Sequence, residues 1–146
     1  MAVQAYINFK GNCREAVEFY SQVFGTEKPQ IMTFGDMPPD PNQQFTLPEE
    51  LKNWVMHARL SIHGSVVMFS DVFPDMPLVV GNNISLTIVT ANMEDITFAF
   101  NKLKEGGKVV MELQETFWSR YYGFVTDKFG IGWQFNYPIC EEAADK

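Results

Sequence analysis

The sequence predicts an α+β protein in which two βαβββ modules form one curved mixed sheet, a cup with the helices on its outer face. Two observations carry this prediction. A strand-like segment followed by an amphipathic helix occurs twice, at residues 3–25 and again about eighty residues later. Each copy is then followed by three further strand-like segments. We expect one domain over residues 1–146, with internal modules at about 3–71 and 82–138.

The first copy begins with residues 3–9 (VQAYINF), which alternate and are rich in strand-forming residues. Residues 11–25 (GNCREAVEFYSQVFG) follow, with apolar side chains at helical spacing. Asn12 and Glu15 have the spacing of an N-cap and its reciprocal partner, and Gly25 occupies the position of a C-cap. The segment therefore predicts a strand followed by a capped helix.

The second copy repeats these features. The strand-like segment is 84–89 (ISLTIV), Asn92 and Asp95 repeat the cap spacing, and Gly106 with Gly107 ends the helix. Three apolar helix positions match across the copies: Ala16 with Ile96, Tyr20 with Phe100, and Val23 with Leu103. The chain is therefore interpreted as an internal duplication.

Three strand-like segments are expected after each helix. Turn signals join the last two of each set, HGS at 63–65 and DKFGIG at 127–132. The segments are 29–34, 54–62 and 65–70 in the first module, and 108–114, 120–127 and 132–137 in the second.

Residues 35–53 are too rich in Pro, Asp and Asn for a strand, and they are longer than an ordinary connection. Loops of this length act as lids or binding loops in some proteins and are disordered surface loops in others, and both interpretations stay open.

Composition excludes several partners. Eleven basic and eighteen acidic residues give a net charge of −7, which disfavours nucleic acid and anionic membranes. No apolar run is long enough to cross a bilayer and the start lacks a signal-peptide pattern, so we expect a cytoplasmic protein. Cys13 and Cys140 are far apart and lack metal-ligand spacing, which predicts two free thiols.

Alternation divides the strands into an apolar face, which we expect to lie under a helix, and a polar face that lines the cup. His57 and Arg59 fall on the polar side, although His57 could be a core histidine and Arg59 a surface charge. Taken together with the other polar positions, they favour a ligand cavity. The expected polar set is His57, Arg59, Ser61, Ser85, Thr87, Gln134 and Asn136, and the apolar set is Ala58, Leu60, Ile62, Leu86, Ile88, Trp133 and Phe135.

The segment 115–130 combines aromatic and charged residues. Phe117, Phe124 and Phe129 are predicted to pack in the core or in turns. Glu115 and Trp118 are predicted at the rim of the cup. Arg120 is expected to share a strand face with Tyr122 and either to bind an anionic ligand group or to pair with Glu115.

Three stretches, residues 6–25, 57–71 and 115–136, resemble the vicinal oxygen chelate superfamily, which includes the glyoxalases and bleomycin resistance proteins. More narrowly the chain resembles the PhnB-like branch, which is also labelled 3-demethylubiquinone-9 3-methyltransferase-like. The resemblance covers residues 3–139. No G-x-G-x-x-G occurs in the chain, so we do not carry over a methyltransferase activity that uses S-adenosylmethionine.

The resemblance implies four metal-ligand positions, which fall on Ala5 and Ser70 in the first module and on Ser85 and Asn136 in the second. None of these side chains is a strong ligand for a divalent transition metal. We therefore expect no metal and no other cofactor. A relocated metal site that uses His57 and Glu115 is conceivable but not favoured.

Three functions are compatible with these residues. The favoured one is a metal-independent small-molecule-binding protein, the second a small-molecule enzyme, and the third a dimeric interaction module. The expected partners are a small organic molecule and, by resemblance, a second copy in a homodimer. His57 and Glu115 are the candidate catalytic base and acid. The candidate ligand-binding residues are Arg59, Ser70, Thr87, Trp118, Arg120, Tyr122, Gln134 and Asn136.

Overall fold

The structure is a computed structural model that describes residues 1–38 and 47–139. The chain divides into two compact units, Met1–Leu78 and Val79–Lys146, and each contains one βαβββ module. Short 3₁₀ helices, η1 (Phe34–Asp36) and η2 (Glu49–Leu51), lie in the long loop. Part of the long loop 35–53, for which a lid and a surface loop both stayed open, falls on residues 39–46, which lie outside the described residues.

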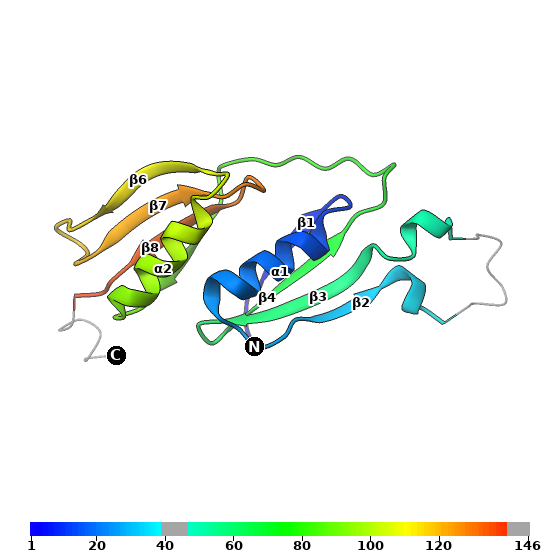
Figure 1. The fold of residues 1–146 in the computed structure, drawn as a ribbon, viewed down its shortest axis with the longest axis horizontal. Coiled ribbons are helices and arrows are strands. Elements are labelled where there is room, and N and C mark those ends of the chain that lie inside the picture. The colour runs from blue at the N-terminus through cyan, green and yellow to red at the C-terminus, as the bar shows by residue number, and fades with distance from the viewer. Residues whose placement is uncertain (39–46, 140–146) are drawn as a thin grey trace. The chain divides into compact units, whose positions relative to one another are not determined.

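The first module contains β1 (Ala5–Phe9), α1 (Cys13–Phe24), β2 (Gln30–Thr33), β3 (Val55–Ile62) and β4 (Ser65–Asp71). Its strands pair in the order β1-β4-β3-β2, with β1 parallel to β4 and the other pairs antiparallel. Helix α1 packs on β3 and β4 (Figure 1).

The second module repeats this plan with β5 (Ser85–Val89), α2 (Met93–Leu103), β6 (Lys108–Gln114), β7 (Tyr122–Thr126) and β8 (Gly132–Asn136). The strand order is β5-β8-β7-β6, again with one parallel pair. Figure 1 shows β6, β7 and β8 with α2. The predicted α+β class and both βαβββ modules are confirmed. The described strands form two four-stranded sheets, one in each module, and the single cup stays a prediction.

Each helix buries aromatic side chains against its own sheet. Tyr20 of α1 is fully buried and stacks on Phe69, and Phe69 stacks on Phe9. In the second module, Phe100 of α2 meets Phe135 edge to face. Burying each such ring contributes about 1.5–3 kcal/mol, so these contacts fix which face of each sheet lies under the helix. The apolar helix positions matched in the sequence are buried in both modules.

The two helix starts are stabilised differently. The predicted cap is confirmed at Asn92, whose side chain accepts a hydrogen bond of 3.0 Å from the backbone N–H of Asp95. At Asn12 it is wrong, because that side chain makes no cap hydrogen bond. Asp71 takes its place and accepts from the backbone N–H groups of Gly11 (2.7 Å) and Cys13 (3.1 Å). A buried carboxylate is a stronger acceptor than an amide oxygen.

Asp71 also joins this helix start to β3. Its second oxygen accepts from the backbone N–H of Val55 at 2.9 Å, and its side chain is buried. Burial and the neighbouring negative charge of Asp71 raise the pKa of the Cys13 thiol. Cys13 is a buried free thiol, and the prediction that it is free is confirmed, whereas Cys140 lies outside the described residues.

Both predicted hairpin turns are confirmed. His63 and Gly64 have φ of 47° and 84°, the left-handed conformations that a tight two-residue turn requires. At the other turn, Asp127 Oδ1 accepts from the backbone N–H groups of Phe129 and Ile131, and its Oδ2 accepts from the Trp133 indole N–H at 2.9 Å. This turn residue thereby fixes the indole of Trp133, the large buried residue of β8, by a hydrogen bond.

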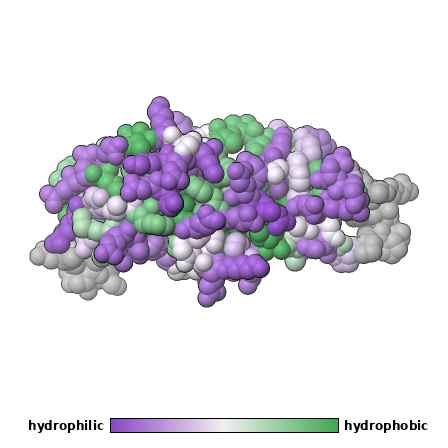
Figure 2. All heavy atoms as spheres, in the orientation of Figure 1, coloured by the Kyte–Doolittle hydropathy of each residue, from purple (hydrophilic) through white to green (hydrophobic). Residues whose placement is uncertain are grey.

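The surface is mostly hydrophilic, with scattered apolar patches in the view of Figure 2. No helix among residues 1–38 and 47–139 is long and apolar enough to span a membrane.

Candidate functional site

In the first module, one face of the sheet lies under α1 and the other carries polar side chains. Ala58 and Leu60 of β3 are buried on the helix side, and His57, Arg59 and Ser61 alternate with them. The register places Gln30 beside Arg59 and Val66 beside Ser61, so these side chains share the polar face. The predicted division of β3 is confirmed.

His57 is half-buried on this face rather than enclosed in the core. Its Nδ1 lies 3.4 Å from the hydroxyl of Tyr6, and the two rings are 5.8 Å apart. Tyr6 was not predicted as a site residue. The alternation of β1 could have identified it, because Phe9 packs under the helix and Tyr6 lies an odd number of positions away.

The implied metal-ligand position at Ala5 is wrong. Ala5 shares a face of β1 with Ile7 and Phe9, and Phe9 packs on the helix side of the sheet. In the second module Ser85 lies on the polar side, where its Oγ accepts from Gln134 Nε2. An offset of eighty residues therefore connects equivalent positions in the two helices. In β1 and β5 the same offset connects residues on opposite faces, so the alternation of the two strands differs by one residue.

Ser70 lies on the polar face as expected, but it is already engaged. Its hydroxyl donates to Asn8 Oδ1 at 3.1 Å, and only 8% of the residue is exposed. Asn8 of β1 is its register partner in β4. The pair closes part of the polar face and leaves Ser70 little room for a ligand contact.

A chain of hydrogen bonds crosses the polar face of the second module. The Tyr122 hydroxyl donates to Gln134 Oε1 at 2.5 Å, and Gln134 Nε2 donates to Ser85 Oγ at 2.7 Å. Burial raises the pKa of the Tyr122 phenol, which keeps it protonated as a donor. The chain joins β7, β8 and β5 and fixes the orientation of the Gln134 amide.

Asn136 lies beside this series of hydrogen bonds as the cross-strand partner of Tyr122. Its Oδ1 is buried and has no hydrogen-bond partner among the described residues. A buried polar atom without a partner costs about 1–3 kcal/mol, so this oxygen keeps an unused capacity to accept a hydrogen bond. Thr87, the register partner of Gln134 on β5, is exposed on the same face.

An aromatic pair lies beside Tyr122. Trp118 meets the Tyr122 ring edge to face with centroids 5.4 Å apart, and 44% of Trp118 is exposed. Phe117 packs edge to face on Trp118 but is 90% exposed, so it does not pack in the core, and it lies in a bend between β6 and β7. The connection between β6 and β7 carries it outward.

Arg120 and Glu115 do not form the predicted alternative pair. Arg120 precedes β7 and its guanidinium lies 6.0 Å from the centre of the Tyr137 ring. In the described part of the chain, no ion pair joins it to Glu115. Glu115 is exposed in the second module and His57 belongs to the first, so their roles as acid and base stay predictions.

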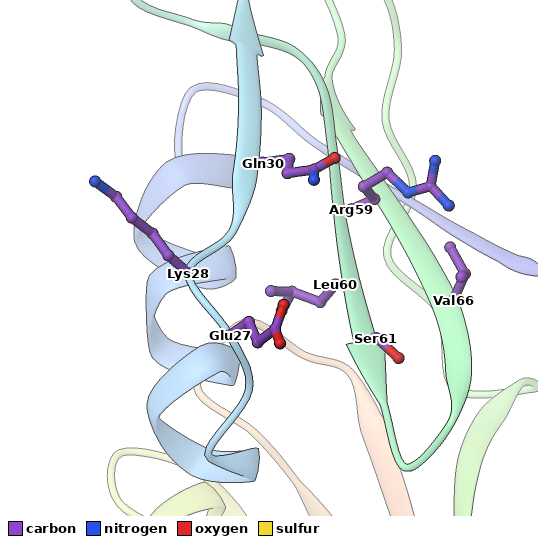
Figure 3. A pocket seen from close by; sticks show the side chains of 7 residues that line it. All are labelled: Glu27, Lys28, Gln30, Arg59, Leu60, Ser61 and Val66. Atoms are coloured by element: carbon purple, nitrogen blue, oxygen red, sulfur yellow. The ribbon is translucent and has the colours of Figure 1, made fainter.

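A separate hollow of 590 Å³ opens in the first module at the N-terminal end of β2 (Figure 3). It arises because β2 begins at Gln30, opposite Arg59, so that residues 60–62 of β3 have no partner strand on this side. Pro29 lacks an N–H and cannot extend the pairing. The lining residues are Glu27, Lys28, Gln30, Arg59, Leu60, Ser61 and Val66.

The donor set of the implied metal site does not suit a divalent transition metal. Ala5 lies on the helix side, Ser70 and Ser85 are hydrogen-bonded to amide side chains, and Asn136 is a neutral amide. Among residues 1–38 and 47–139, no three His, Cys, Asp or Glu side chains come close enough to hold a metal ion.

Comparisons with known proteins agree with this architecture. The Glyoxalase/Bleomycin resistance protein/Dioxygenase superfamily model matches residues 5–135. Protein YjdN of Escherichia coli (strain K12) is 32% identical over 140 residues, covering 93% of this chain and 95% of the relative. The crystal structure of protein PA1353 from Pseudomonas aeruginosa is 34% identical, with a TM-score of 0.77, and covers 94% of this chain and 98% of the other.

A structure titled "Putative 3-demethylubiquinone-9 3-methyltransferase, PhnB protein, from Bacillus cereus" shares the fold at 24% identity. Its TM-score is 0.70, and the match covers 94% of this chain and 99% of that chain. The predicted resemblance is confirmed: from the strand order, the paired modules and the match over residues 5–135, the chain belongs to the Glyoxalase/Bleomycin resistance protein/Dioxygenase superfamily.

Proposed function

We propose that the chain is a small-molecule-binding protein of the glyoxalase/bleomycin-resistance type that holds its ligand without the usual metal site. The observation that carries the proposal is the buried Oδ1 of Asn136, which has no partner among the described residues. A bound molecule that donates a hydrogen bond there would remove the cost of leaving this oxygen unsatisfied.

The surroundings of this oxygen define the kind of ligand. The Ser85–Gln134–Tyr122 chain is fixed before binding, so little side-chain entropy would be lost when a ligand arrives. Trp118 presents a partly exposed ring beside Tyr122. An aromatic molecule that carries an N–H or O–H donor matches both features.

The test compares indole with benzofuran, which has the same shape but replaces the N–H by an oxygen. We expect indole to raise the melting temperature more than benzofuran does, and Asn136→Leu to abolish the difference. Thr126→Val, on the same face of β7 as Tyr122, serves as a control that keeps it. Equal effects of the two probes on the unaltered protein would refute the role of Asn136.

Metal independence has its own test. After exhaustive chelation, zinc, nickel or manganese at a hundredfold excess over the dissociation constant would add about 2.7 kcal/mol of stability if any of them bound the folded state. We expect no shift in the melting temperature. A shift that His57→Ala removes would instead establish a relocated metal site.

An enzymatic role is the second candidate, and the contact between His57 and Tyr6 on the polar face favours it. A histidine near neutral pH is the natural proton carrier, and the Tyr6 hydroxyl would orient its ring. Under this alternative, His57→Gln abolishes turnover of a substrate, whereas under simple binding it changes affinity alone.

Two further expectations concern the whole protein. We propose a homodimer, because members of the superfamily often pair, and analytical ultracentrifugation would test it. The cytoplasmic location stays a prediction, to be checked by cell fractionation.

A further inference from the structure

The hollow at the end of β2 carries two opposite charges that do not meet. Glu27 enters from the α1–β2 connection, and its carboxylate points toward Leu60 and Ser61, whereas Arg59 extends from β3 on the side of Val66 (Figure 3). Neither charge forms an ion pair with another described residue. The hollow therefore carries a negative charge on one side, from Glu27, and a positive charge on the other, from Arg59.

The remaining lining residues narrow the choice of ligand. Lys28 points away from the strands, so the two basic side chains do not converge on one anion (Figure 3). Gln30 extends toward β3 and, with the Ser61 hydroxyl, supplies neutral hydrogen-bonding groups. Leu60 and Val66 add apolar atoms. The volume of 590 Å³ lies within the range of about 300–1,000 Å³ that is usual for small-molecule sites.

From this arrangement we infer that the first module binds a small aliphatic zwitterion of the α-amino acid type. The ammonium group would face Glu27, the carboxylate would face Arg59, and a short aliphatic chain would contact Val66. A simple anion would be repelled by Glu27, and a simple cation by Arg59. The inference concerns the first module alone and does not depend on Asn136.

The side chains of Glu27 and Arg59 are exposed, so binding is weak, with a dissociation constant in the millimolar range. The test is an NMR titration of the full chain that follows the backbone amides of Gln30, Arg59 and Ser61. Three probes separate the contributions of the two charges. L-norvaline carries both, butylamine is norvaline without the carboxylate, and pentanoate is norvaline without the amino group. We expect norvaline to bind about fivefold more tightly than either fragment.

Matched variants complete the test. Glu27→Gln and Arg59→Gln should each weaken norvaline binding by about threefold to fivefold, because each removes one exposed charge contact. Lys10→Gln, at an exposed lysine of the first module that does not line the hollow, should leave the affinity unchanged. The double exchange Glu27→Arg with Arg59→Glu should restore binding in the reverse orientation.

Three outcomes would overturn the inference. Pentanoate binding as tightly as norvaline, with a loss on Lys28→Gln, would identify an anion site. Unchanged norvaline affinity in both single variants would show that the charges are not used. The absence of any shift at these amides at saturating millimolar norvaline would show that the hollow is no site. Indole and benzofuran binding to the second module is measured separately, so either proposal can fail alone.

Discussion

Replacing Asp71 by asparagine should destabilise the first module strongly. One carboxylate oxygen accepts from the N–H groups of Gly11 at 2.7 Å and Cys13 at 3.1 Å, and the other accepts from Val55 at 2.9 Å. Asparagine has nearly the same volume but only one acceptor oxygen. Its amide group would therefore place a donor against at least one of these N–H groups.

The size of the effect follows from these contacts. A hydrogen bond to a charged acceptor contributes about 1.5–3 kcal/mol, and a buried N–H left without a partner costs about 1–3 kcal/mol. Because local relaxation recovers part of this sum, we expect the free energy of unfolding to fall by about 3 kcal/mol. For a chain of this size, the melting temperature should fall by about 6–12 °C.

Urea denaturation followed by circular dichroism measures the loss. Asp36→Asn is the control, because that carboxylate is exposed and bonds to Thr33 alone, through its backbone N–H and its side chain, so its replacement should cost less than about 1 kcal/mol. A second measurement follows the Cys13 thiol. The charge of Asp71 helps to raise its pKa, so the substitution should make the native thiol easier to ionise. An Asp71→Asn protein as stable as the Asp36→Asn protein would refute this reasoning.

Three other predictions concern single side chains. Asp127→Asn should destabilise the second module by about 2–3 kcal/mol and alter Trp133 fluorescence, because the indole N–H would lose its charged acceptor; unchanged emission would contradict this. In a Cys140→Ser background, Cys13 should react with a thiol reagent only as fast as the protein unfolds, since burial raises its pKa, and rapid labelling of the native protein would disprove it. The raised pKa of Tyr122 means that the unfolded chain ionises first, so stability should fall as the pH rises above about 10. Tyr122→Phe should reduce this alkaline fall, which urea denaturation at increasing pH measures, and an unchanged fall would exclude Tyr122 as its source.

The elements of the fold could be predicted from the sequence because their signals are local. Helical spacing identified the buried positions of α1 and α2, and turn residues identified both hairpins. The cap of α1 could not be predicted in this way. Its acceptor, Asp71, lies sixty residues after Gly11 in the chain and becomes its neighbour only through the parallel pairing of β1 with β4.

The candidate site was predictable in part for the same reason. Strand alternation correctly placed His57, Arg59, Gln134 and Asn136 away from the helices. It could not show that Gln134 bridges Ser85 and Tyr122, because that contact joins three strands. The role of Glu27 could not be predicted from the sequence. Its side chain lines a hollow that exists only because β2 begins opposite Arg59 and leaves residues 60–62 of β3 unpaired on that side.

The one-residue displacement between β1 and β5 means that the two halves of this duplicated chain are no longer interchangeable parts. Counting eighty residues forward from a helix position reaches an equivalent side chain, as from Tyr20 to Phe100. The same count from Ala5 reaches Ser85, which points to the opposite side of its sheet. Any graft of a strand from one half into the other, or any symmetric redesign, must shift the copied sequence by one position to keep its core.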